Sequence, residues 1–214
     1  MMKTILLFTA ALLFSLSDGF AQYDLNSDFN TRINFGAKIG TNYSNVWDSE
    51  GEAFNADAKF GLAFGAFLSI PIGTDIGIQP EVLFSQRGFQ AIGKILGRDY
   101  DFKRTISYLD IPLYFAVKPA DFITILVGPQ FSYLLKREDQ FANAVTTISQ
   151  EEEFENDNIR ENTLGAAVGI DLNFGHFLVG LRANWDLQGN NGEGESTTPR
   201  YKNQWFQGTL GYRF

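Results

Sequence analysis

The sequence predicts an all-β fold, an eight-stranded antiparallel up-and-down transmembrane β-barrel. Three observations support this prediction. Apolar and polar residues alternate with a period of two in eight segments, and the connections between these segments alternate between long and short. The 214-residue chain also contains 21 Phe and 21 Gly but no Cys, a composition typical of a membrane barrel and unusual for a soluble enzyme.

Composition excludes several classes of function. The absence of Cys rules out disulfide scaffolds and cysteine-ligated zinc, and the single His rules out a multi-histidine metal centre. The formal net charge of −8 argues against a nucleic-acid partner, because binding to phosphates requires clustered Lys and Arg. The length suits a single domain, and no cofactor is indicated.

Residues 1–21 read as a secretory signal peptide that is cleaved on export. Lys3 supplies the positive charge, an apolar stretch of 12 residues follows from Ile5 to Leu16, and Gly19-Phe20-Ala21 forms a small-x-small cleavage site. The apolar stretch is too short for a membrane-spanning helix, which needs about 20 residues. We therefore assign residues 22–214 to the barrel domain.

The first three predicted strands are residues 32–43, 59–70 and 76–87. In each of them every second residue is apolar or uncharged, and the charged residues lie on the opposite face. Their stripes comprise Ile33, Phe35, Ala37, Ile39, Thr41 and Tyr43, then Phe60, Leu62, Phe64, Ala66, Leu68 and Ile70, then Ile76, Ile78, Pro80, Val82 and Phe84.

The fourth and fifth strands are predicted at 107–117 and 122–135, and the last three at 163–173, 177–187 and 203–214. The same alternation defines them, and none of the stripes contains a charge. The last strand ends with Phe206, Leu210, Tyr212 and Phe214 on the apolar face.

Seven connections separate the eight strands, at residues 44–58, 71–75, 88–106, 118–121, 136–162, 174–176 and 188–202. Bacterial outer-membrane barrels have short periplasmic turns and longer external loops. The spacing therefore predicts four external loops and places both chain ends on the periplasmic side.

A soluble lipocalin-type barrel has a similar strand pattern, but its apolar residues face inward around a ligand. Here the apolar stripes are too large and too free of charge to face water on eight strands, so we expect them to face lipid. The opposite faces then line a polar interior, which the side chains of an eight-stranded barrel fill.

Charged residues on these inward faces are expected to form a structural network in the barrel interior. Charges removed from water must be paired. The acids are therefore expected to pair with the bases across a set of eight residues: Lys38, Glu81, Arg87, Asp110, Asp171, Arg182, Asp186 and Arg213.

Four motifs resemble the PorT-like outer-membrane β-barrel family. They are Gly36-Ala37-Lys38-Ile39-Gly40-Thr41-Asn42-Tyr43-Ser44, Gln79-Pro80-Glu81-Val82-Leu83-Phe84-Ser85-Gln86-Arg87-Gly88, Tyr108-Leu109-Asp110-Ile111-Pro112-Leu113-Tyr114 and Val127-Gly128-Pro129-Gln130-Phe131-Ser132-Tyr133. The resemblance implies a porin-like barrel in the outer membrane of a Gram-negative bacterium. One namesake of the family is associated with protein secretion, and no catalytic residues accompany the resemblance.

The aromatic C-terminal strand resembles the signal by which the barrel assembly machinery recognises its clients. We interpret Phe206, Leu210, Tyr212 and Phe214 as this signal. The same residues also serve as ordinary lipid-facing bulk, and the two interpretations are compatible.

Two other features suggest chemistry only weakly. His176 falls in a short turn on the predicted periplasmic side, which disfavours a histidine-dependent site at the cell surface. The acidic run 151–157 has oxygen ligands suited to Ca²⁺, but its spacing matches no EF-hand, so a solvated acidic loop is the favoured interpretation.

The sequence therefore predicts a non-enzymatic outer-membrane barrel with a structural or interaction role. Expected partners are membrane lipid, the assembly machinery during biogenesis, and secretion-system or cell-surface proteins. The alternatives are an accessory component of a secretion apparatus, a lipid-modifying or proteolytic barrel enzyme, and a narrow channel.

Overall fold

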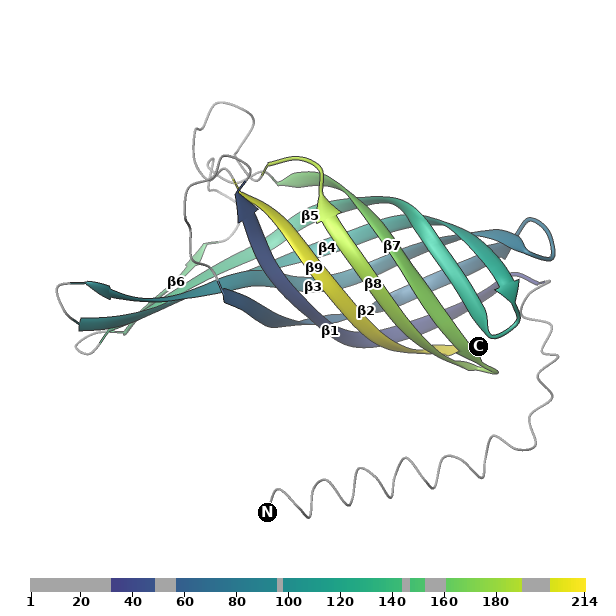
Figure 1. The fold of residues 1–214 in the computed structure, drawn as a ribbon, viewed down its shortest axis with the longest axis horizontal. Coiled ribbons are helices and arrows are strands. Elements are labelled where there is room, and N and C mark those ends of the chain that lie inside the picture. Colours follow the sequence, from purple (N-terminus) through teal and green to yellow (C-terminus); the bar gives the residue numbers. More distant parts are fainter. Residues whose placement is uncertain (1–31, 49–56, 96–97, 144–146, 153–160, 190–200) are drawn as a thin grey trace, which may run out of the picture.

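The chain folds into one closed β-barrel, shown in Figure 1. The computed structural model describes residues 32–48, 57–95, 98–143, 147–152, 161–189 and 201–214. The predicted signal peptide, residues 1–21, lies outside the described residues. The strands are β1 Asn34–Asp48, β2 Asp57–Pro71, β3 Ile76–Ile95, β4 Arg98–Ala120, β5 Ile123–Asn143, β6 Thr147–Glu152, β7 Asn162–Phe174, β8 Phe177–Asp186 and β9 Tyr201–Arg213.

Eight of these strands form the ring, in the order β4-β3-β2-β1-β9-β8-β7-β5, and the pairing of β4 with β5 closes it. All pairings are antiparallel. The first and last strands meet in a continuous ladder that includes Ala37↔Tyr212 and Ile39↔Leu210. This arrangement confirms the predicted fold class.

The two ends of the barrel differ. At one end, which we call the turn end, β2 and β3, β4 and β5, and β7 and β8 are joined by short connections. The chain terminus lies there too, and Phe214 N donates to Phe35 O at 2.9 Å. At the opposite end, which we call the loop end, β3, β4, β5 and β6 extend beyond the other strands (Figure 1).

This extension corrects two of the predicted loops. Residues 88–106 are not a loop, because β3 and β4 stay paired from Arg87↔Ile106 to Ile95↔Arg98. Within the predicted loop 136–162, β5 continues to Asn143 and β6 pairs with it from Arg137↔Glu152 to Ala142↔Thr147. The alternation of apolar and polar residues requires that one face of the strand is apolar. Beyond the lipid neither face needs to be apolar, so the alternation ends although the backbone pairing continues.

The outward face is apolar along the whole ring. Phe60 and Phe206 are 68% and 67% exposed, whereas the inward-facing Lys38 is only 4% exposed. Large apolar side chains therefore face away from the barrel and charges face into it, which is the reverse of a lipocalin-type barrel. The predicted stripes all lie on the outward side.

Gly88 is one of two described glycines whose positive φ is a backbone conformation that other residues rarely adopt. Gly88 has a φ of 152° and sits on β3 at the loop end of the interior. Its N–H donates to Ser44 Oγ and its carbonyl accepts from the same hydroxyl, both at 2.9 Å. This contact links β1 directly to β3, which is its second neighbour in the ring.

A search of the described ranges finds no helix with the length and apolar character needed to cross a membrane.

The outward stripe gives a first testable prediction. Val127 lies midway along the apolar part of β5 and is 51% exposed, so a charge there would sit in the middle of the lipid. We expect Val127→Arg to lower the free energy of unfolding, measured by urea titration in lipid vesicles, by about 2–4 kcal/mol.

Gln140 provides the matched control, because it is exposed but lies on the extension of β5. Gln140→Arg is expected to change the free energy of unfolding by no more than about 0.5 kcal/mol. Equal effects of the two substitutions would contradict the assignment of the stripe to lipid.

Candidate functional site

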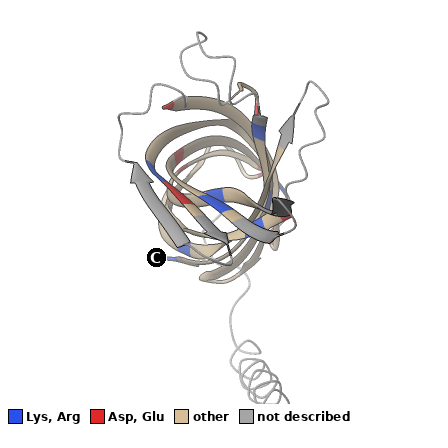
Figure 2. Cartoon of the chain, turned by 90° about the vertical axis from the view of Figure 1, so that its left-hand side faces the viewer, with Lys and Arg blue, Asp and Glu red and all other residues tan. Residues whose placement is uncertain are grey.

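The most structured polar region of the protein is the inside of the barrel. Figure 2 views the barrel from the loop end and shows charged residues on the strands that surround the interior. The eight predicted residues are all buried there, with exposures of 8% or less. They come from β1, β3, β4, β7, β8 and β9 and meet in two main clusters.

The first cluster, the central quartet, consists of Lys38, Glu81, Asp171 and Arg182. Lys38 Nζ lies 2.7 Å from Glu81 Oε1, and Arg182 Nη2 lies 2.8 Å from Asp171 Oδ1 and 3.6 Å from Glu81 Oε1. Two cations and two carboxylates make the quartet electrically neutral. Each side chain is only 1% exposed, so the pairing compensates for the loss of water around all four groups.

Neutral donors and acceptors complete the central quartet. Gln79 Nε2 donates to Glu81 Oε1 at 2.8 Å and to Asp171 Oδ2 at 3.4 Å, which bridges the two acids. Arg182 Nη1 donates to the backbone carbonyls of Ile170 and Leu181, both at 3.1 Å. The quartet is therefore also attached to the barrel wall.

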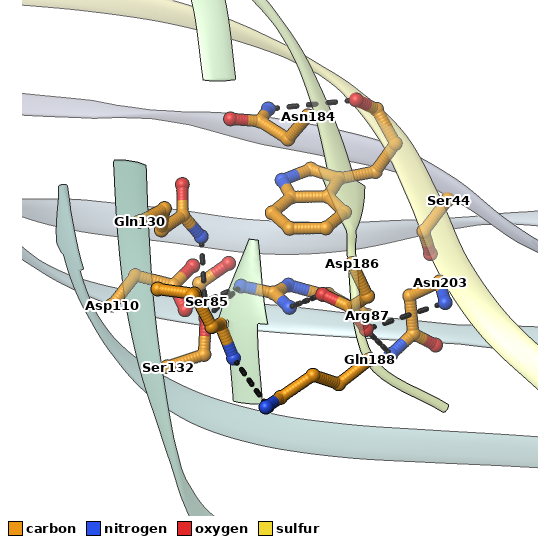
Figure 3. A network of polar contacts seen from close by, with 12 residues as sticks. Ser44, Ser85, Arg87, Asp110, Gln130, Ser132, Asn184, Asp186, Gln188 and Asn203 are labelled. Carbon is orange, nitrogen blue, oxygen red and sulfur yellow. Dashed lines mark hydrogen bonds and ion pairs between the residues drawn. The ribbon is translucent and has the colours of Figure 1, made fainter. Parts of the chain in front are cut away.

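The second cluster, the Arg87 cluster, lies nearer the loop end and is drawn in Figure 3. Arg87 Nη2 contacts Asp110 Oδ1, and Nη1 lies 3.5 Å from Asp186 Oδ1. Asn203 Nδ2 donates to Asp186 Oδ2 at 2.6 Å, and Arg87 Nη2 donates to Ser132 Oγ at 3.1 Å. One cation thus serves two acids, and Asn203 and Ser132 add hydrogen bonds from neutral side chains.

Aromatic rings enclose the same guanidinium. The Arg87 guanidinium carbon lies 3.5 Å from the centre of the Trp205 ring and 4.5 Å from that of Tyr108. Cation–π attraction is strongest where water is excluded, and Arg87 is 1% exposed. These contacts fill the middle of the barrel with interlocking side chains.

The structure distributes the pairs differently from the expected arrangement of four acids with four bases. Lys38, Arg87 and Arg182 share the four acids among them. Arg213 lies at the turn end, where its Nη2 donates to Asn173 Oδ1 at 2.8 Å. Asn173 Nδ2 in turn donates to Thr124 Oγ1 at 3.0 Å.

Lys118 is an interior charge that the sequence reasoning missed. It is 7% exposed on β4, and it was assigned to the turn 118–121 because the predicted strand ended at Val117. The period of two does predict this burial. Asp110, Tyr114 and Lys118 are separated by even numbers of residues on one strand and therefore share its inward face.

The interior also contains apolar and aromatic side chains. The sequence analysis predicted only a polar lining. Tyr114, Ala116, Leu126 and Ala167 form a buried cluster on β4, β5 and β7. The ring of Tyr114 lies 5.3 Å from the Arg182 guanidinium, which joins this cluster to the central quartet.

The predicted assembly-signal residues lie on the outer face of β9. Phe206, Leu210, Tyr212 and Phe214 are 67%, 64%, 39% and 58% exposed. Tyr212 packs edge-on against both Phe177 and Phe214, with ring centroids 5.2 Å apart in each pair. Tyr212, Phe177 and Phe214 therefore form an aromatic cluster at the turn end.

His176 lies in the turn between β7 and β8. Its ring stacks on Tyr212 at 5.5 Å, and its Nδ1 lies 2.7 Å from Arg213 O. Across the described residues, no group of three or more His, Asp or Glu side chains is arranged to hold a metal ion. In the acidic run 151–157, residues 153–157 lie outside the described residues.

A closed barrel with an apolar exterior and a neutralised, charged interior defines the class of transmembrane β-barrels. The chain belongs to the outer membrane protein beta-barrel domain family, whose model matches residues 20–190. It is therefore an outer-membrane protein.

Several solved structures of bacterial outer-membrane proteins are similar to the chain. Ail, the attachment invasion locus protein of Yersinia pestis, is 14% identical with a TM-score of 0.47, over 85% of this chain and 98% of that chain. Neisserial surface protein A is 11% identical with a TM-score of 0.43, over 84% and 97%. The N-terminal barrel domain of Pseudomonas aeruginosa OprF is 9% identical with a TM-score of 0.38, over 84% and 97%. No curated protein matches the sequence.

The Arg87 cluster gives a second prediction. Arg87→Met would leave Asp110 and Asp186 buried without their shared cation, so we expect the free energy of unfolding to fall by about 3–5 kcal/mol. The triple variant with Asp110→Asn and Asp186→Asn added removes the uncompensated charges. It should regain a large part of that loss in urea titrations.

Lys202→Met serves as the control, because Lys202 is partly exposed and its Nζ donates to a backbone carbonyl, Leu187 O, at 2.9 Å. Its effect should stay within about 0.5 kcal/mol. If the triple variant is less stable than Arg87→Met, the account of the interior as a charge-compensated network is wrong.

Proposed function

We propose that the protein is a non-enzymatic barrel that is closed to solutes and presents a recognition surface outside the cell. The observation that carries this proposal is the extension of β3–β6 beyond the rest of the ring, above an interior filled by its own side chains. A rigid scaffold that supports surface elements is a common basis for recognition.

The proposed orientation follows from the two ends. Short turns of outer-membrane barrels face the periplasm and long connections face outward, so the turn end is assigned to the periplasm and the extension to the cell surface. Export through the cleaved signal peptide 1–21 and recognition of Phe206, Leu210, Tyr212 and Phe214 by the assembly machinery belong to the same proposal.

The extension is suited to binding because hydrogen bonds organise it in advance. β4 pairs with β5 up to Tyr100↔Asn143, and β6 adds a further strand to β5. On its inward face Arg104 holds Asp139 through two hydrogen bonds of 2.7 Å, and Arg137 Nη2 lies 3.2 Å from the same carboxylate. A preorganised surface loses less conformational entropy on binding than a flexible loop does.

The interior supports closure to solutes. Arg87, Tyr108 and Leu126 are at most 1% exposed, and they come from three neighbouring strands of the ring. Eight strands enclose a space that side chains fill, unlike the 16 to 18 strands of porins that leave an aqueous channel. The position of His176 at the turn end also separates it from the proposed external surface, which favours a role without catalysis.

An accessory role in protein secretion is the alternative, and it rests on the resemblance of four motifs to PorT-like proteins. In that role the turn end would contact a periplasmic or membrane partner. The two roles therefore predict contacts at opposite ends of the barrel.

Closure to solutes predicts the behaviour of the purified protein in planar bilayers. We expect no discrete conductance steps beyond those of the bare bilayer, because buried side chains such as Arg87, Tyr108 and Leu126 occupy the interior. A porin of 16 strands provides the positive control. Reproducible steps that disappear when the protein is unfolded would show that the interior conducts.

The recognition role predicts that photo-crosslinks form at the loop end. A photoreactive amino acid at Gln140, exposed on the β5 extension, should link to a second protein in intact cells. The matched site is Thr74, exposed in the turn between β2 and β3. Crosslinks at Thr74 alone would contradict the proposal and favour the secretion role.

A further inference from the structure

A groove opens on the outer wall of the barrel near the loop end, where β8, β9 and β1 lie side by side (Figure 1). Its volume is about 270 Å³, close to the lower end of the range for small-molecule sites. We call it the interfacial groove. Two rows of residues cross the three strands and line it: Ala183, Phe206 and Tyr43 in the row nearer the turn end, and Trp185, Gln204 and Asn45 in the row nearer the loop end.

The interfacial groove lies at the border of the lipid-facing surface. Phe206 and Trp185 are 67% and 43% exposed and alternate along β9 and β8 with buried residues, so they point out of the barrel. On the outer faces of β9 and β1, the next row toward the loop end contains the amides Gln204 and Asn45 instead of apolar residues. Interfacial Trp and Tyr rings, with a change from apolar to polar side chains, mark the level of the lipid headgroups.

The described residues that line the interfacial groove carry no charge. Lys202, two residues beyond Gln204 on β9, directs its Nζ to Leu187 O at 2.9 Å. Asp57 belongs to β2, which lies on the far side of β1 from β9. A phosphate is held by charge-assisted hydrogen bonds from cations, which these lining residues do not provide. The groove is therefore suited to an uncharged ligand.

Two polar side chains of the groove are available to such a ligand. No hydrogen bond within the described part of the chain engages the indole of Trp185 or the side-chain amide of Gln204. The indole N–H donates and the amide both donates and accepts, which matches the hydroxyl groups of a sugar. The rings of Tyr43, Trp185 and Phe206 suit the C–H face of a sugar ring, because the face of an aromatic ring is negative.

An apolar furrow continues from the groove toward the middle of the membrane. Gly208 follows Phe206 on the outer face of β9 and lies between Thr41 on β1 and Leu181 on β8. Among the described residues, a methyl group at Gly208 would meet only Leu181 Cδ2, at 4.0 Å. The flanking Phe206 and Leu210 project outward and are 67% and 64% exposed. The depression between these two side chains is open to an acyl chain.

We propose that the interfacial groove binds the uncharged sugar ring of a glycolipid in the outer leaflet, with an acyl chain of this lipid in the furrow. The sugar packs against the aromatic rings, and its hydroxyl groups form hydrogen bonds with Trp185 and Gln204. The inference rests on the proposed orientation, which places the loop end in the outer leaflet.

The test measures how much of a glycolipid probe stays bound to the folded protein, purified from membranes, in native mass spectrometry. The probe is glucosyl diacylglycerol, and the detergent is an amine oxide, which contains no sugar. Trp185→Leu and Gln204→Leu should each weaken binding by about five- to tenfold, because each removes one hydrogen-bonding group and Trp185→Leu also removes a ring.

A second variant tests the shape of the site. Ala183→Phe keeps both polar side chains but fills the groove, so it should weaken binding by about tenfold or more. Phe131→Leu is the matched control for Trp185→Leu, because Phe131 is an outward aromatic residue of β5 with the same exposure, 43%. It should bind the probe like the wild type.

Four results would overturn the proposal. The first is equal binding by the wild type and the double variant Trp185→Leu/Gln204→Leu, with both shown to be folded by their heat-dependent gel mobility. The second is equal binding of diacylglycerol without its sugar, and the third is equal binding of phosphatidylethanolamine. The fourth is a dimer that Ala183→Phe disrupts and the probe does not, which would assign the groove to a second copy of the chain.

Failure of the proposed orientation is detected separately. The chain has no Cys, so Gln140→Cys introduces a unique thiol on the extension. Labelling of this thiol in intact cells by a membrane-impermeant maleimide supports the external assignment. Labelling only after the outer membrane is opened would overturn both the orientation and the outer-leaflet ligand, whereas external labelling without binding of the probe would overturn the groove proposal alone.

Discussion

The need to satisfy every backbone hydrogen bond without water is the constraint on which the rest of the structure depends. In lipid an unpaired N–H or C=O costs several kcal/mol, so a sheet that crosses a membrane must have no free edge. The β1–β9 and β4–β5 ladders remove the edges of this sheet. Closure then forces alternate side chains into a narrow interior, and this is why that interior must be neutralised and filled.

The interior meets this demand by sharing charges rather than by isolated pairs. Glu81 lies between Lys38 and Arg182, and Arg87 lies between Asp110 and Asp186, so each cluster connects opposite parts of the ring. The beyond-membrane parts of β3, β4 and β5 are free of the lipid constraint. There β4 and β5 carry charges on both faces, which provides the surface that we assign to recognition.

Much of this arrangement could be predicted from the sequence, because lipid imposes a strict period of two. The eight membrane-crossing strands and the inward direction of Lys38 and Asp171 follow from that period alone. The extension did not follow, because β3 and β4 remain paired beyond Arg87 without an apolar face. Which acid meets which base depends on the register and tilt of strands that are distant in sequence. The same is true of the extra residue Leu135, which lies on β5 between the pairs Tyr108↔Leu134 and Ser107↔Lys136.

The most direct test of the central claim compares the two faces of the barrel wall with single cysteines in this cysteine-free chain. Ala37→Cys and Ala66→Cys lie on the outward face, and Ala63→Cys and Ala167→Cys lie on the inward face. In lipid vesicles a photoactivated carbene reagent dissolved in the membrane, which does not require an ionised thiol, should modify the first two thiols and leave the second two unmodified. Modification of the inward pair, with protection of the outward pair, would contradict the claim that the apolar face meets lipid and the charged face is enclosed.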